Sequence, residues 1–198
     1  MSRPAVIFGD VHGAAFQLHT LLRQVAERFG SDVDLYSVGD LVDRGPDSKG
    51  VISACVDSGV QGILGNHELW LRELILGAPM DQTPYAPIMG GIATLQSYGV
   101  SASQPSSNGP ALLAAMPQAH RDWLRDLPPF RFIEVAGVRY ALVHGGVSVE
   151  LWDLITTAAQ TYDLDTEQML EVLVHFQPAS YFWAGTSPKS QKGLAHLG

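Results

Sequence analysis

The sequence predicts an α/β fold in which short strands alternate with helices. Apolar runs at residues 5–8, 35–38 and 60–64 have the length of buried strands, and a helical pattern of apolar residues follows each of them. Strands separated by helices form parallel sheets through right-handed crossovers. A later pair of apolar runs flanks Ala136-Gly137, which indicates a β-hairpin. We therefore expect helices layered against β-structure.

The first three helices are predicted from periodicity and from their end signals. Residues 14–29 place a row of apolar side chains on one face, and Gly30 follows where a C-cap glycine is common. Residues 48–57 form a short helix with Cys55 facing inward, and a third helix starts at about His67.

Residues 77–117 interrupt this alternation with repeated prolines and glycines. A stretch of this length inside a compact domain is usually a lid or a binding loop. Short helices are expected within it at residues 92–98 and 111–116. Beyond it the sequence predicts a helix at 119–127, strands at 130–135 and 138–143, and a late helix at 166–176. We interpret residues 1–198 as one domain, with 77–117 as a lid or cap-like insertion.

The composition argues against several classes of protein. The chain has 198 residues, 46% of them apolar, and a formal net charge of −8, which argues against a nucleic-acid-binding surface. No apolar run approaches the roughly 20 residues of a membrane helix, and the segment before Asp10 is too short for a signal peptide. We therefore expect a cytoplasmic protein without membrane association. The single cysteine, Cys55, rules out an internal disulfide. Nothing in the sequence specifies an oligomeric state.

Four glycine-flanked motifs carry acids and histidines at or near the ends of predicted strands. They are Gly9-Asp10-Val11-His12-Gly13, Gly39-Asp40-Leu41-Val42-Asp43-Arg44-Gly45, Gly65-Asn66-His67-Glu68 and His144-Gly145-Gly146. Side chains placed just beyond the ends of several strands gather at one edge of a sheet. Oxygen ligands mixed with imidazoles suit a pair of divalent metal ions, and such pairs act on phosphate esters.

The spacing of these residues predicts how two ions would be shared. Asp10 and His12 are two apart, so both project to one side of an extended segment and can hold one ion together with Asp40. Asp40 can bridge to a second ion held by Asn66 and His144. Metals in such pairs lie roughly 3.5–4 Å apart, and a water between them can be a hydroxide near neutral pH.

Three further residues of the motifs are predicted to act in catalysis and substrate binding. His67 can protonate the leaving oxygen as a general acid, and Asp43 can orient its ring and favour the imidazolium. Arg44 offers a planar fork that matches two phosphate oxygens.

Each motif by itself also has an ordinary structural explanation. Gly-Asp pairs are common in turns, and Asn66 before a helix is a plausible N-cap. Asp43 and Arg44 could form a weak ion pair in an exposed turn. The four motifs in this order, each near a strand end, make these separate explanations a poor account of the whole.

Together these motifs resemble the phosphoprotein phosphatase branch of the calcineurin-like metallophosphoesterases, of the bacterial Ser/Thr phosphatase type. The resemblance spans residues 5 to about 150, and residues 90–99 also look like bacterial members. It implies a central β-sandwich flanked by helices, two divalent metal ions (manganese, iron or zinc), and direct attack on phosphorus by a metal-bridging hydroxide. Carried over residue by residue, it implies that the metal ligands are Asp10, His12, Asp40, Asn66 and His144. It implies an acid pair of His67 and Asp43, and phosphate binding by Arg44 and Asn66.

The chain departs from the family pattern near its C-terminus. Members carry one more metal-binding histidine in a Gly-His motif after a late strand, and no Gly-His pair follows His144 here. His196 is the remaining candidate, although its surroundings match a strand-delivered ligand poorly. We therefore expect the C-terminal strands and the last ligand to be absent from this chain.

Three functions are consistent with these residues. The first is metal-dependent hydrolysis of phosphomonoesters, with phosphoserine or phosphothreonine in proteins or a small phosphoester as substrate. The second is hydrolysis of diadenosine polyphosphates, although related bacterial enzymes tend to lack an acid at the position of Asp43. The third is a non-catalytic metal-binding interaction module, which the missing ligand would favour.

Overall fold

The computed structural model describes residues 3–81, 83–103, 107–145, 149–162 and 168. The chain forms two compact units, Met1–Pro128 and Pro129–Gly198. Within the late helix predicted at 166–176, residue 168 alone is described, and the candidate ligand His196 lies outside the described residues. Within the described part of the chain, no helix is both long and apolar enough to cross a membrane.

The first unit contains a parallel sheet of three strands in the order β1-β2-β3. The strands are β1 (Ala5–Phe8), β2 (Asp34–Ser37) and β3 (Gln61–Gly62). Val6 pairs with Leu35, and Tyr36 pairs with Gln61. This parallel pairing of strands separated by helices confirms the predicted parallel sheet.

β3 is shorter than the predicted strand at 60–64, because the chain changes partner after two residues. The backbone N–H of Ile63 still donates to the Ser37 carbonyl at 3.0 Å, but that of Leu64 donates to Pro128 at 2.8 Å. Both side chains are nevertheless fully buried, as their apolar character predicts.

The crossovers are formed by α1 (Ala15–Phe29) and α2 (Ser48–Asp57), which contact each other. In α1, Leu18 and Val25 are buried, and Gly30 ends the helix with a φ of 62°. The Asp47 carboxylate caps α2 by accepting from the Gly50 N–H at 2.7 Å. Cys55 is fully buried inside α2, as predicted.

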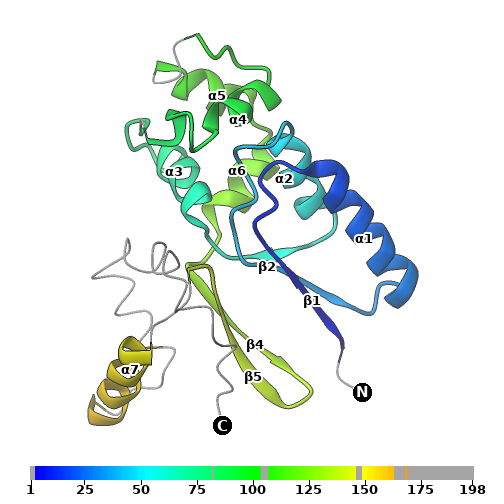
Figure 1. Cartoon of the computed structure of the whole chain (residues 1–198), viewed down its shortest axis with the longest axis vertical. Coiled ribbons are helices and arrows are strands. Elements are labelled where there is room, and N and C mark those ends of the chain that lie inside the picture. The colour runs from blue at the N-terminus through cyan, green and yellow to red at the C-terminus, as the bar shows by residue number, and fades with distance from the viewer. Residues whose placement is uncertain (1–2, 82, 104–106, 146–148, 163–167, 169–198) are drawn as a thin grey trace. The chain divides into compact units, whose positions relative to one another are not determined.

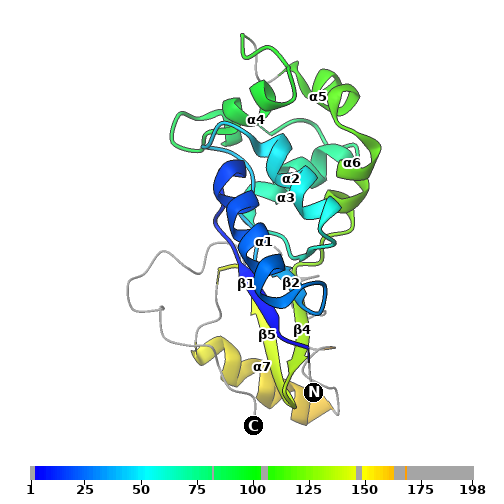
Figure 2. The ribbon, with the colours of Figure 1, turned by 90° about the vertical axis from the view of Figure 1, so that its right-hand side faces the viewer.

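The remaining helices of this unit include α3 (Asn66–Ile75) and α6 (Gln118–Arg125). The segment 77–117 contains a 3-10 turn, η1 (Thr83–Tyr85), and the two expected helices, α4 (Gly91–Ser97) and α5 (Gly109–Ala115). Both α4 and α6 contact α2, and α6 also contacts α3. In both views, α4 and α5 lie at the end of this unit toward which β1 runs (Figure 1, Figure 2).

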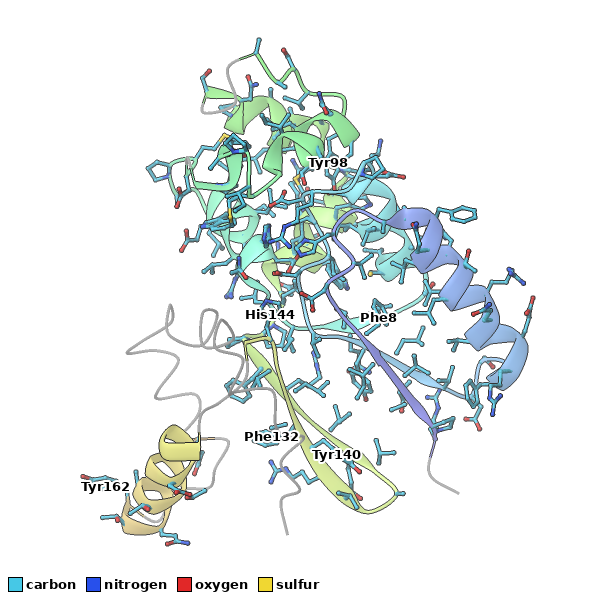
Figure 3. All side chains as sticks on the ribbon, viewed as in Figure 1. Phe8, Tyr98, Phe132, Tyr140, His144 and Tyr162 are labelled. Carbon is cyan, nitrogen blue, oxygen red and sulfur yellow. The ribbon has the colours of Figure 1, made fainter. Side chains whose placement is uncertain are left out.

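The second unit contains the predicted hairpin of β4 (Phe130–Val135) and β5 (Val138–Val143), paired antiparallel. Ala136 and Gly137 both have left-handed backbones, which suits a two-residue hairpin turn. Figure 3 labels His144 just past the end of β5. Helix α7 (Val149–Tyr162) follows, and the sequence analysis had not predicted it.

Candidate metal and phosphate site

The loops that follow β1 and β2 hold an unusual concentration of left-handed backbone. Six described residues other than glycine have positive φ angles, and five of them belong to the predicted site. Those five are Asp10 (52°), His12 (45°), Asp40 (53°), Asp43 (68°) and Arg44 (65°). Such conformations cost of the order of 1–3 kcal/mol each and persist where the surroundings enforce them, commonly at functional sites.

Hydrogen bonds between the two loops enforce these conformations. The backbone N–H groups of Asp10, His12 and Gly13 donate to the carbonyls of Gly39, Asp40 and Leu41 at 3.0, 3.0 and 2.8 Å. The ladder begun by β1 and β2 therefore continues into the loops. This continuation places the first two motifs side by side.

Gly45 closes the same contact at its far end. Its N–H donates to the His12 carbonyl at 2.9 Å, and a Cβ atom built on it would lie 2.1 Å from that oxygen. Any larger residue at this position would push the two loops apart. The glycine that ends the second motif is thus required by backbone approach rather than by chemistry.

The buried Glu68 side chain anchors the loop after β2 through hydrogen bonds to its backbone. Its Oε2 accepts from the N–H groups of Asp40 (2.7 Å) and Gly65 (3.0 Å), and its Oε1 accepts from those of Leu41 (2.7 Å) and Val42 (3.1 Å). The side chain is fully buried. Burial and the nearby Asp40 carboxylate raise the pKa of Glu68, and the backbone donors oppose that rise.

The sequence analysis assigned no role to Glu68, although a signal was present. In a capping box, an acid at the third position of a helix accepts a hydrogen bond from the backbone N–H of the residue just before the helix. Here the same carboxylate also reaches the neighbouring loop, which local sequence cannot show.

His12, Asp40 and His67 form a group whose ligand atoms all lie within 4.8 Å of one another. The Asp40 Oδ2 atom lies 3.6 Å from His12 Nε2 and 3.9 Å from His67 Nε2. The two imidazole rings are 4.8 Å apart, edge to face. Two imidazoles and a carboxylate are a donor set that suits a divalent transition metal.

The hydrogen bonds assign the tautomer of His12. His12 Nδ1 lies 3.0 Å from the Val42 carbonyl, so this nitrogen carries the proton. Its Nε2 lies 2.8 Å from the Arg44 guanidinium, which can only donate, so Nε2 presents a lone pair. The pKa of His12 is lowered, mainly by burial and also by Arg44, which favours the neutral ring that a metal requires.

The positively charged guanidinium of Arg44 therefore lies against the Nε2 atoms of His12 and His67, the same atoms that lie near Asp40. Its second terminal nitrogen lies 3.3 Å from His67 Nε2, while the residue itself is exposed. The site therefore already accommodates a cation between its two histidines. This observation, together with the donor set, shows that the residues fit a bound metal ion.

His67 and Asp43 form the predicted pair. His67 Nδ1 lies 2.7 Å from Asp43 Oδ2, and both side chains are almost completely buried. The Trp70 ring packs edge-on against His67 at 5.4 Å. Because the Nδ1 proton is committed to Asp43, only Nε2 of His67 can exchange a proton with a substrate.

The other predicted ligands lie as follows. Asp10 is exposed and is not part of the three-residue group, and Asn66 is the half-buried first residue of α3. His144 belongs to the second unit. The structure therefore brings together His12 and Asp40 from the expected set, along with His67, which was expected to act as an acid.

Two residues that contact Asp43 were not predicted from the sequence. Ser48, at the start of α2, and Thr94, in α4, both accept from the Asp43 N–H at 3.0 Å. Thr94 lies 51 positions away in the sequence. Thr94 had one sequence signal, its position inside the segment 90–99, whereas Ser48 had none.

Comparison with known proteins places this site in a family. The model of the calcineurin-like phosphoesterase family matches residues 3–189. The chain therefore belongs to the calcineurin-like phosphoesterases and has their mixed α/β fold. It is a metallophosphoesterase by family, as its sequence motifs predicted.

Curated relatives carry a more specific name. The chain is 34% identical over 155 residues to a symmetrical bis(5'-nucleosyl)-tetraphosphatase of Pectobacterium atrosepticum, covering 76% of this chain and 45% of that protein. It is 31% identical over 199 residues to the protein of the same name from Cronobacter sakazakii, covering 96% and 60%. The chain spans about half the length of the curated relatives it matches.

Among solved structures, the chain is similar to a metallophosphoesterase from Sphaerobacter thermophilus. The identity is 21%, the TM-score is 0.38, and the match covers 68% of this chain and 44% of that one.

Proposed function

We propose that this protein hydrolyses phosphate esters or anhydrides with the help of divalent metal ions, and that a symmetrical dinucleoside tetraphosphate is its leading substrate. The observation that carries the chemistry is the convergence of His12, Asp40 and His67 beside the Arg44 guanidinium. The substrate class is supported by the name of the curated relatives.

The proposed ligands are those expected from the sequence. They are Asp10, His12, Asp40, Asn66 and His144, holding two ions, with manganese first and iron or zinc as alternatives. Such ions, when bound, neutralise phosphate charge and activate a water molecule. Asp40 is central to this proposal because it lies between both histidines of the group.

Arg44 changes its partner in this proposal. In the structure it donates to His12 Nε2, so it must leave that nitrogen before His12 can coordinate an ion. The residue is exposed, which leaves its guanidinium room to turn toward a substrate phosphate and bind two of its oxygens. Asn66 would assist in holding the phosphate.

Once Arg44 has turned away from His67 Nε2, a protonated His67 would donate its Nε2 proton to the leaving oxygen, with Asp43 keeping the ring in position. This pair is the specific observation that favours a second substrate class, the phosphomonoesters, including phosphoserine and phosphothreonine in proteins. An alkoxide is a poor leaving group and gains much from a proton. The terminal phosphate oxygen of a departing nucleoside diphosphate is stable as an anion and gains little.

Rates on both substrate classes would test the proposal. The protein would be assayed with and without manganese on a dinucleoside tetraphosphate, a phosphoserine peptide and p-nitrophenyl phosphate. We expect manganese-dependent cleavage of the tetraphosphate into two nucleoside diphosphates at the highest rate. A faster reaction with the phosphopeptide would assign the protein to the second class. Manganese binding without turnover of any substrate would refute both classes and favour a non-catalytic metal-binding module.

We also propose that residues 77–117 shape the entrance of the site within a single domain. Residues of this segment and the two members of the acid pair line one small cavity. Those from the segment are Met80, Asp81, Pro84, Tyr85, Gly91 and Thr94. We further propose, as the sequence led us to expect, that the protein is cytoplasmic and belongs to the phosphoprotein phosphatase branch of its family.

A further inference from the structure

We propose that Thr94 is a positioning residue for the acid pair, and that α4 holds residues 43 and 44 in their active arrangement. This inference rests on the proposed role of His67 as a general acid. It accounts for residues 90–99, which the sequence analysis singled out without finding a function for them.

The hydrogen bonds around Thr94 converge on the Asp43 carboxylate, which is the partner of His67. The Thr94 hydroxyl donates to Asp43 Oδ1 at 2.6 Å. Because that hydroxyl has one proton, its oxygen can only accept from Ser48 Oγ, which lies 2.8 Å away. The other carboxylate oxygen of Asp43 accepts from His67 Nδ1 at 2.7 Å. The result is a continuous chain from Ser48 through Thr94 and Asp43 to His67.

Burial makes this chain sensitive to the loss of one hydroxyl. Ser48 and Thr94 are 0% and 2% exposed, and Asp43 and His67 are 3% and 1% exposed. Water therefore has little access to replace a missing donor on Asp43 Oδ1. A carboxylate left with one unpaired oxygen would turn to recover a partner and would carry the His67 ring with it.

A second contact fixes the neighbouring residue from the same helix end. The Gly90 carbonyl, immediately before α4, accepts from the Arg44 N–H at 3.1 Å. Gly90 has a φ of 80°, and a Cβ atom built on it would lie 2.5 Å from the Arg44 nitrogen. Gly90 and Thr94 thus hold two consecutive residues, Asp43 and Arg44, that both have left-handed backbones. Figure 3 shows Tyr98, just past α4, among the helices of this unit.

Three variants separate positioning from simple structural support. Thr94→Val keeps the shape of the side chain and removes the hydroxyl, whereas Thr94→Ser keeps the hydroxyl. Ser97→Ala is the control, because the Ser97 hydroxyl accepts from the Lys49 N–H at 3.2 Å and donates to the Thr94 backbone carbonyl at 2.8 Å, so these bonds hold α4 without involving the Asp43 carboxylate. Each variant would be assayed on phenyl phosphate, a poor leaving group, and on 2,4-dinitrophenyl phosphate, a good one.

We expect Thr94→Val to lower kcat on phenyl phosphate by about 10- to 100-fold with KM unchanged, which is part of the full worth of a positioned acid. Its kcat on 2,4-dinitrophenyl phosphate should change by less than about 3-fold, because that leaving group needs no proton. Thr94→Ser should restore the wild-type ratio of the two rates, and Ser97→Ala should not alter it. An equal loss on both substrates in Thr94→Val would overturn the inference.

A measurement without substrate or metal separates this inference from the proposed function. The Nδ1–H proton of His67, bonded to Asp43, should give a downfield NMR resonance in histidine-labelled protein. We expect Thr94→Val to move or broaden that resonance, and Thr94→Ser and Ser97→Ala to leave it in place. An unchanged resonance in Thr94→Val refutes positioning by Thr94. A shifted resonance in a protein that hydrolyses neither substrate refutes the proposed function and retains the structural link.

Discussion

The Nδ1 atom of His67 donates to Oδ2 of Asp43 across 2.7 Å in a part of the protein that excludes almost all solvent. The two residues come from different motifs, one at the start of α3 and one in the loop after β2. Their contact fixes both the tautomer and the orientation of the imidazole. It also directs the remaining nitrogen, Nε2, toward Arg44 and Asp40.

Replacing His67 with Asn should slow hydrolysis of phenyl phosphate by about 100- to 10,000-fold, the usual contribution of a positioned acid. His19→Asn, an exposed residue of α1, is the control and should keep the wild-type rate. Steady-state kinetics with manganese would measure both. Full activity in His67→Asn would remove this residue from its proposed role.

Replacing Asp40 with Asn should weaken manganese binding by more than about 100-fold, since changes beyond the direct ligands already cost about 10- to 100-fold. The reason is the position of its Oδ2, within 3.6 and 3.9 Å of the two histidine nitrogens. Calorimetric titration would measure the affinity. Asp32→Asn removes an exposed carboxylate that pairs with Arg3 and should bind manganese as wild type does. Equal affinity in both variants would contradict the proposed site.

Replacing Glu68 with Gln should lower the free energy of unfolding by about 3 kcal/mol, because two of the four backbone donors would then face an amide NH₂ group. Urea unfolding would measure the loss. Glu73→Gln, at an exposed position of the same helix, should change stability by less than about 0.5 kcal/mol. A Glu68→Gln protein as stable as Glu73→Gln would show that the carboxylate does not anchor the loop.

His120 should make the protein less stable in acid. Its ring is buried in contact with Ser53 and Tyr98, and its pKa is lowered by burial first and by Lys49 second, while Asp57 opposes the shift. The unfolded chain therefore binds this proton more readily than the folded protein does. Stability should be unaffected well above the ordinary histidine pKa of about 6.5 and should fall as the pH drops below it.

The contribution of His120 can be isolated with His120→Gln, which keeps polar contacts but does not titrate. Urea unfolding at about pH 7.5 and about pH 5 should show a smaller loss of stability in the variant than in the wild type, by at most about 1.4 kcal/mol for each pH unit. His12 also has a lowered pKa, so a residual pH dependence is expected in both proteins. An identical pH dependence in the two would contradict this assignment.

Much of the fold could be predicted because local patterns determine it. The bounds of α2 match the prediction at both ends, since Asp47 caps its start, and Ser58 and the left-handed Gly59 follow its end. The hairpin was predicted because two apolar runs flank Ala136-Gly137, and the structure gives both residues the left-handed backbone that such a turn requires. β3 was predicted too long because its apolar residues are buried by packing after the ladder has ended.

The site was predictable only where its residues carry chemistry of their own. His12, Asp40, Asp43 and His67 stood out because acids and histidines follow strands in the sequence. Thr94 and Glu68 did not, because their roles depend on contacts with distant backbone that no local pattern encodes. The helix α7 was not predicted, and the predicted role of His144 stays a proposal.

The central claim is that His12 and Asp40 hold a metal centre of two ions, and anomalous diffraction from manganese-loaded crystals tests it most directly. We predict two peaks roughly 3.5–4 Å apart. At least one peak should lie within coordination distance of His12 Nε2 and Asp40, with Arg44 no longer bonded to His12. Absence of peaks, or peaks bound only by residues elsewhere in the chain, would contradict the account.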